Sequence, residues 1–298
     1  MDNFHKSVLL NEVIDLLQVE KGRKYIDATL GGGGHTFEIL KQGGEVLAID
    51  LDEEAIEYVK KKILDSGFET RLKLVKGNFS EIEAIARKNK FDEINGIVFD
   101  LGVSSHQIDT AERGFSFLKK GPLDMRMDKD ATLTAEYLVN LLEKEKLNEI
   151  FNKLGQENRA NAISGAIIRA RRMNAIKTTE DLVNTIKEAY GFKGVISDFQ
   201  KNKISQKIFQ ALRIAVNNEI ENIRLALPQA ISLLSSRGVL CIISFHSIED
   251  AIVKNTFKQF EAVGLGEIIT KKPTYATQAE LYINTKAKSA KLRAFRKY

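Results

Sequence analysis

Apolar and polar positions follow two alternating patterns along the first hundred residues. Short apolar runs, of the kind expected for strands buried on both faces, occur at Lys24–Ala28, Glu45–Ile49, Arg71–Val75 and Ile94–Phe99. Stretches with helical spacing occur at residues 5–18, 35–41, 53–64 and 80–88. This alternation of strand and helix predicts a parallel sheet covered by helices.

The pattern then becomes helical almost throughout residues 132–226. Within it, Thr178 is positioned to cap a helix, with Asp181 three residues further on. A buried strand is expected again at Val239–Phe245. Gly266–Thr270 and Leu281–Asn284 look like two later strands, which could form a terminal hairpin.

The order of these elements predicts an interrupted α/β chain. Residues 1–108 and 206–298 are expected to form a doubly wound, Rossmann-like domain, and residues 109–205 an inserted all-helical domain.

Composition places the chain among ordinary globular proteins, with 298 residues, 43% hydrophobic and 29% charged. Its longest apolar run, Val239–Phe245, is far too short to cross a membrane. Asp2, His5 and Glu12 make the beginning of the chain unlike a signal peptide. The only cysteine, Cys241, excludes an internal disulfide. We therefore expect a cytoplasmic protein without a membrane partner.

Basic residues are concentrated at the end of the chain, and the net charge is +5. The last thirteen residues contain no acid and six basic residues: Lys286, Lys288, Lys291, Arg293, Arg296 and Lys297. The remainder carries 39 basic and 40 acidic residues. Such a tail is typical of a nucleic-acid contact and equally of a solvated, disordered terminus.

Four glycines, Gly31 to Gly34, follow the first predicted strand. Glycines without side chains let a ligand approach the backbone closely. The dinucleotide fingerprint requires glycine at a first, third and sixth position, and no start within this loop satisfies it. A nicotinamide dehydrogenase would share the fold, but this spacing argues against it.

Three further strand ends carry ligand-type residues, and ligands of open parallel sheets bind at such ends. Asp50 lies 19 residues after Gly31, where an acid commonly binds ribose hydroxyls, which suits an adenosine-containing cofactor. Phe79 could stack on adenine or belong to the core. Asp100 could meet the reacting end of the ligand or cap the next segment.

The histidines predict no metal site, because His5, His35, His106 and His246 lack ligand spacing and a second cysteine is absent. His246 follows a strand, so it could be a site residue or a capping residue. Cys241 lies mid-strand among apolar residues, which indicates an inert core thiol.

Several longer motifs resemble the bacterial MraW methyltransferases, which modify N4 of a cytidine in 16S ribosomal RNA. The matching stretches are Val8–Glu12, Gly33–His35, Asp100–Ser105 with Gln107, Ala111–Phe117, Gly121–Asp128, Phe209–Ile214, Ile243–Ser247 and Ser289–Arg293. The sequence departs from the family pattern at Ser7, Leu154–Glu157 and Lys203–Lys207. The segment between Ile248 and the tail also looks short.

This resemblance implies S-adenosylmethionine as cofactor and 16S ribosomal RNA of the small subunit as partner, without a metal. It implies a methyltransferase domain with a helical insert. Gly33, Gly34 and His35 would line the cofactor, and Asp50 would hold its ribose. The remaining cofactor residues would be Phe79 near the adenine, with Asp100 and Gln107 completing the pocket.

Catalysis needs an acceptor for the protons of the cytidine amine, for which Asp100 is the candidate, with Ser104 and His106 as helpers. Cations for the RNA backbone are expected at Arg169, Arg171, Arg172, Lys291 and Arg293, although any of these arginines could simply be solvated. Two alternatives remain. One is a methyltransferase of another RNA, a protein or a small molecule, and the other is a noncatalytic RNA-binding protein, which would not bind the cofactor.

Overall fold

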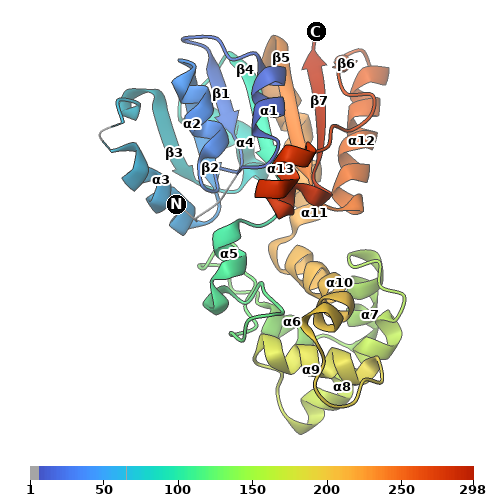
Figure 1. Ribbon diagram of the computed structural model, residues 1–298. Helices are drawn as coiled ribbons and strands as arrows, with labels where there is room; N and C mark the ends of the chain where they lie inside the picture. Colours follow the sequence, from blue (N-terminus) through green and yellow to red (C-terminus); the bar gives the residue numbers. More distant parts are fainter. Residues whose placement is uncertain (1–6, 65) are drawn as a thin grey trace. The chain divides into compact units, whose positions relative to one another are not determined.

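The computed structural model describes residues 7–64 and 66–298 (Figure 1). The chain divides into two compact units. The first comprises residues up to Ser104 together with Ile220–Tyr298, and the second, the inserted unit, comprises Ser105–Glu219. The sequence had suggested an insert of residues 109–205. The division falls later at its end because α10 (Asp198–Asn217) is one continuous helix.

The first unit is built on a seven-stranded sheet. Its strands are β1 (Lys24–Asp27), β2 (Glu45–Asp50), β3 (Leu72–Lys76), β4 (Ile94–Asp100), β5 (Leu234–Ser244), β6 (Gly266–Ile268) and β7 (Lys291–Lys297). They lie in the order β3-β2-β1-β4-β5-β7-β6. The first five are parallel, whereas β7 is antiparallel to both of its neighbours. The strand order reverses between β1 and β4, the point at which ligands bind in such sheets.

Helices cover both faces of this sheet (Figure 1). One face packs against α1 (Leu10–Leu17), α2 (Gly34–Lys41) and α3 (Glu53–Ile63), and the other against α4 (Ile82–Lys88), α11 (Glu219–Leu233) and α12 (Ser247–Ala262). Successive strand residues face opposite sides, so that Tyr25 joins one core and Ile26 the other. This arrangement confirms the predicted doubly wound α/β fold.

Local sequence explains where these helices begin and end. In α3, Asp52 accepts a hydrogen bond from the backbone N–H of Glu54, and acids occupy the first turn. Lysines fill the last turn, where cations favour the negative end of the helix dipole.

The prediction of a strand at Leu281–Asn284 was wrong. These residues belong largely to α13 (Gln278–Ile283), which Thr277 caps by accepting a hydrogen bond from the N–H of Glu280. The terminal strand is instead β7, in the basic tail. Its alternation of basic and apolar residues has the period of a strand, so the interpretation as a disordered terminus was also wrong.

The inserted unit is helical, as the sequence predicted. Its helices are α5 (Ser105–Asp109), α6 (Ala135–Leu141), α7 (Lys144–Lys153), α8 (Ala160–Met173), α9 (Thr179–Ala189) and α10. The predicted capping box of Thr178 and Asp181 at α9 is confirmed. Short 3₁₀ segments of the two units lie at Glu69–Arg71, Phe79–Glu81, Ala111–Arg113 and Thr285–Ser289. No described helix of either unit is long and apolar enough to cross a membrane.

Side chains of the inserted unit hold the irregular segment before α6. The Arg113 guanidinium donates to the carbonyl oxygens of Arg126 and Met127, both at 3.0 Å. The Asn217 amide donates to the carbonyl of Met125 at 2.8 Å and accepts from the N–H of Met127 at 2.7 Å. One of the family-like stretches, Gly121–Asp128, is therefore a loop fixed by long-range hydrogen bonds.

Candidate active site

Asp27, which ends β1, is at the centre of the polar groups at the carboxyl edge of the sheet. Its side chain is buried and accepts hydrogen bonds from the Thr36 hydroxyl at 2.7 Å and the Thr29 N–H at 3.2 Å. Burial raises the pKa of Asp27, while nearby His35 opposes this rise and the like charge of Asp100 adds to it. Sequence reasoning did not single out Asp27, although its place before the glycine turn was a usable signal.

Thr29 links this group to the neighbouring strand end. The backbone N–H of Asp100 donates to the Thr29 hydroxyl at 2.6 Å, and β1 and β4 are adjacent parallel strands. Asp27 and Asp100 are therefore joined through one threonine at the point where the strand order reverses.

The glycines of the loop also have a packing role within the protein. Gly33 has φ +77° and precedes α2, a conformation that favours glycine. A Cβ at Gly34 would lie 2.0 Å from the Ser7 hydroxyl oxygen. At Gly33 it would meet Val59 at 2.9 Å and Phe37 at 3.0 Å. Neighbouring side chains thus leave no room for a side chain at these two positions. This explains the glycines differently from the sequence analysis, which attributed them to the close approach of a ligand.

Asp50 ends β2, and two backbone amides fix its carboxylate. One oxygen accepts from the Gly31 N–H and the other from the Asp52 N–H, both at 2.8 Å. Burial raises the pKa of Asp50 to about 6, against the effect of these two hydrogen bonds. A carboxylate oxygen can accept more than one hydrogen bond, so the fixed carboxylate can still receive the two hydroxyls of a ribose.

His35, in the first turn of α2, supplies an unsatisfied polar atom. The residue is only 3% exposed, and within the described residues its Nε2 has no hydrogen-bond partner. Buried polar atoms are rarely left in this state, so the orphaned nitrogen fits a ligand with a polar group. Together with the Asp50 carboxylate, it suits the polar parts of an adenosine-containing cofactor.

Phe79 lies after β3 in a 3₁₀ turn and packs against the core. Its ring meets that of Phe99 edge to face, with centroids 5.6 Å apart. Phe79 is half-buried, so both the core role and a contact with adenine are open to it. Its role towards adenine stays a prediction.

The other proposed site residues lie at the start of the insert. Ser104 is the last residue of the first unit before the insert, whereas His106 and Gln107 lie on α5 of the inserted unit. Gln107 is buried. Their roles in catalysis and cofactor binding stay predictions.

The three arginines of α8 differ in their surroundings. The Arg171 guanidinium donates to the carbonyls of Val139 and Leu142 at 2.9 and 2.7 Å and so closes the end of α6. Arg169 lies 4.0 Å from Glu188, and Arg172 is exposed. Of the three, Arg171 therefore has a clear structural task.

The cations of the basic tail are largely engaged within the first unit. Arg293 is 8% exposed and donates to the Asp250 carboxylate at 2.6 and 3.3 Å. Lys291 lies 3.6 Å from the same carboxylate. These cations lower the pKa of Asp250, although burial acts in the opposite direction. Further along, Lys297 donates to the carbonyl of Ser232 in the last turn of α11 and to that of Leu234, the first residue of β5.

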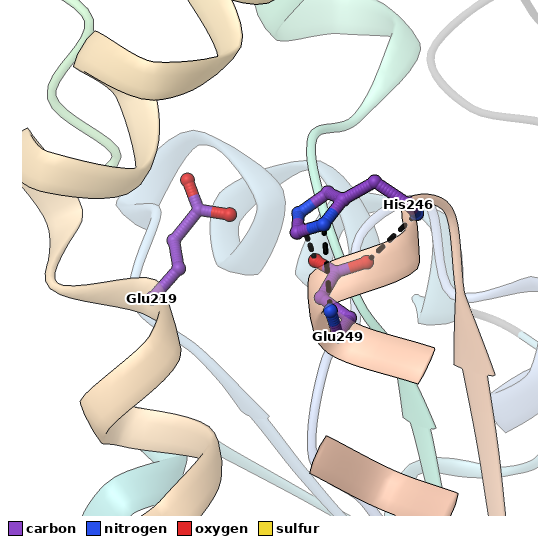
Figure 2. Close-up of side chains that lie close together, drawn as sticks. All are labelled: Glu219, His246 and Glu249. Atoms are coloured by element: carbon purple, nitrogen blue, oxygen red, sulfur yellow. Dashed lines mark hydrogen bonds and ion pairs between the residues drawn. The ribbon is translucent and has the colours of Figure 1, made fainter. Parts of the chain in front are cut away.

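His246 is a capping residue of α12, one of the two roles that the sequence left open (Figure 2). Its Nδ1 accepts from the Glu249 N–H at 3.4 Å, while Glu249 accepts from the N–H of His246 at 3.3 Å. Glu219, also labelled in Figure 2, pairs with Arg213 at 2.8 and 3.0 Å. All three labelled side chains carry atoms of a kind that can bind a metal ion. Each of them nevertheless has a structural role, in the cap of α12 or in the pair with Arg213. The absence of a metal stays a prediction.

Comparison with known sequences decides the family. The model of the MraW methylase family matches residues 2–298. The chain belongs to the MraW methylase family. A relative from Halothermothrix orenii, called Ribosomal RNA small subunit methyltransferase H, is 42% identical, and the match covers 97% of each chain. A relative of the same name from Clostridium botulinum is 40% identical over the whole of both chains.

Solved structures are more distant. An rRNA methylase from Streptococcus thermophilus is 12% identical with a TM-score of 0.47, and the match covers 98% of this chain and 97% of that one. The sequence match alone makes this MraW methylase an S-adenosylmethionine-dependent methyltransferase. The resemblance stated from the motifs is confirmed. The fixed Asp50 carboxylate and the orphaned nitrogen of His35 fit that cofactor.

Proposed function

We propose that this MraW methylase transfers a methyl group from S-adenosylmethionine to N4 of a cytidine in 16S ribosomal RNA, in the cytoplasm. The observation that carries the proposal is the pair of acids, Asp27 and Asp100, at the point where the strand order of the sheet reverses. Asp100 ends β4 there and is joined through Thr29 to the buried Asp27. The names of the curated relatives support small-subunit RNA as the substrate.

The exocyclic amine of cytidine is a poor nucleophile because its lone pair is conjugated with the ring. S-adenosylmethionine, when bound, supplies an electrophilic methyl group. Asp100 would accept a hydrogen bond from the amine, hold its nitrogen in line with that methyl group and take up the proton that the methylated nitrogen loses. The hydrogen bond from the Asp100 N–H to Thr29 fixes the backbone that presents this carboxylate. Ser104 and His106 are proposed as helpers.

The cysteine argues against methylation at carbon 5 of the base. That reaction needs a thiolate nucleophile. Cys241 is completely buried in β5, and burial raises the pKa of its thiol, so the thiolate form is strongly disfavoured. Methylation of the amine requires no covalent bond to the enzyme and fits the residues present.

The test is a methyl-transfer assay. The protein is incubated with radiolabelled S-adenosylmethionine and small ribosomal subunits that lack their own modification, and the labelled nucleoside is mapped by mass spectrometry. Label on N4 of one cytidine supports the proposal. Cofactor binding by calorimetry without label would point to another substrate, and absence of binding would favour a noncatalytic RNA-binding protein. C241A should retain full transfer, whereas label on carbon 5 would contradict the proposed chemistry.

A further inference from the structure

Large apolar side chains are exposed where α9 leads into α10 of the inserted unit. Val195 is 101% exposed, Phe199 is 79% and Phe192 is 36%. With Lys193 and Lys203 they form what we call the α9–α10 surface. Single exposed apolar residues are common, whereas several close together are a feature of interaction surfaces.

The backbone presents these side chains in a defined way. Gly191 and Gly194 have φ of +77° and +69°, and the Phe192 N–H donates to the Lys187 carbonyl at 3.2 Å. Ile196 anchors the turn in the core, with 7% exposure. The turn is therefore folded onto its own unit and leaves the neighbouring apolar side chains outside.

Helical spacing aligns the second part of the surface. Ser197 and Gln200 form a capping box that starts α10. Residues four apart lie on the same face of a helix, so Phe199 is followed on that face by Lys203. An aromatic ring and a cation thus lie side by side along the exposed part of α10.

The part of the inserted unit that carries this surface has an excess of basic residues. Residues 150–219 contain twelve basic and six acidic residues, whereas residues 105–149 contain seven and nine. The nearby acids are occupied, since Asp198 lies 3.4 Å from Lys201 and Glu188 lies 4.0 Å from Arg169. Lys193 and Lys203 are exposed, so their charges face solvent.

Exposed aromatic rings beside lysines are the chemistry that binds unpaired nucleotides. Bases stack on the rings without a demand for sequence, and the lysines neutralise phosphates. A protein partner would use the apolar side chains but gain little from uncompensated lysines. The tail offers less for this task, because Arg293 and Lys291 already pair with Asp250.

We propose that the α9–α10 surface binds an unpaired segment of the RNA substrate. Phe199 and Phe192 stack on bases, and Lys193 and Lys203 contact phosphates. The inference rests on the proposed function, which supplies RNA as the substrate, and extends it to particular contacts.

The first experiment measures binding of the full chain to a labelled single-stranded RNA of about 12 nucleotides, a typical site size, by fluorescence anisotropy. F199A should weaken binding about tenfold, and F199W should retain it, because stacking needs a ring. Y282A is the matched control, since Tyr282 is 91% exposed in the other unit, and it should bind as the wild type. Equal affinity of F199A and wild type for the RNA would overturn the proposal. It would also be overturned if the wild type bound a duplex RNA as tightly as the single strand.

Salt dependence tests the lysine. K203Q should reduce the slope of log affinity against log salt by about 0.7, the value for one phosphate contact on a single strand. K258Q, which removes an exposed lysine of α12, should leave the slope unchanged. An unchanged slope for K203Q would contradict the phosphate contact.

Methylation of small ribosomal subunits separates this inference from the proposed function. If the wild type is active and F199A has a raised KM, the result supports both the proposed function and the RNA contact of the α9–α10 surface. If the wild type is active but F199A and K203Q keep its RNA affinity and its KM, only the role of the α9–α10 surface is overturned. If the wild type is inactive but its RNA affinity still depends on Phe199, only the proposed substrate is overturned. Weaker binding of F199A to whole subunits but not to bare RNA would assign the surface to a protein partner and overturn the inference.

Discussion

Cofactor binding should depend on pH through the carboxylate of Asp50. Burial raises the pKa of this group from 3.8 to about 6. The ionised carboxylate can accept hydrogen bonds from ribose hydroxyls, whereas its protonated form loses acceptor capacity. Affinity for S-adenosylmethionine should therefore rise with pH through about 6 and fall below it.

The size of the effect follows from the pKa. One pH unit below it, at about pH 5, roughly ten molecules are protonated for each one that is ionised. If only the ionised form binds well, the dissociation constant should increase about tenfold between pH 8 and pH 5. D50N cannot ionise and should bind at least about tenfold more weakly at pH 8, because hydrogen bonds to charged groups contribute about 1.5–3 kcal/mol.

Calorimetry from pH 5 to pH 8 on wild type and D50N measures both effects. The step near pH 6 should disappear in D50N, while E53Q, which removes a neighbouring exposed carboxylate, should keep it. A step that persists in D50N would assign the titration to another group, such as Asp27, whose pKa is also raised. A constant wild-type affinity across this range would refute the reasoning.

Three further predictions concern activity and stability. D100N should lose about 100-fold in turnover, measured by single-turnover methyl transfer at saturating cofactor; full turnover would exclude the acceptor role. G34A should lower the free energy of unfolding by about 1–3 kcal/mol, because its Cβ meets the Ser7 hydroxyl, and S7G should recover part of this loss in thermal unfolding. R293A should cost about 3 kcal/mol in chemical denaturation, since it leaves the Asp250 carboxylate with only the longer contact to Lys291. A stability equal to the wild type in either variant would contradict the packing described.

Local sequence patterns were sufficient to predict an element wherever one type of residue determines its structure. The apolar runs that end at Asp50 and Asp100 predicted β2 and β4, because strands buried on both faces need continuous apolar residues. The Thr178 capping box was predictable because its two hydrogen bonds lie within one turn. The four-glycine loop was likewise visible, although the reason for Gly34 was not, since Ser7 is distant in sequence.

The terminal region shows where local patterns were insufficient. A short apolar stretch such as Leu281–Asn284 has no period long enough to separate helix from strand, and the cap at Thr277 decided for α13. The basic tail contained an alternation typical of a strand, but its charges suggested a solvated terminus. Pairing of β7 with β5 and the ion pair with Asp250 of α12 bury Arg293.

The sequence by itself determined the fold class, the helical insert, the family and the acids at strand ends, because each depends on spacing along the chain. Only the tertiary structure decided which of these groups interact. Asp27, Thr29 and Asp100 come from two strands, and their hydrogen bonds arise because β1 and β4 are neighbours in the sheet. Burial likewise depends on what packs around a residue, so only the folded protein could reveal the raised pKa of Asp50.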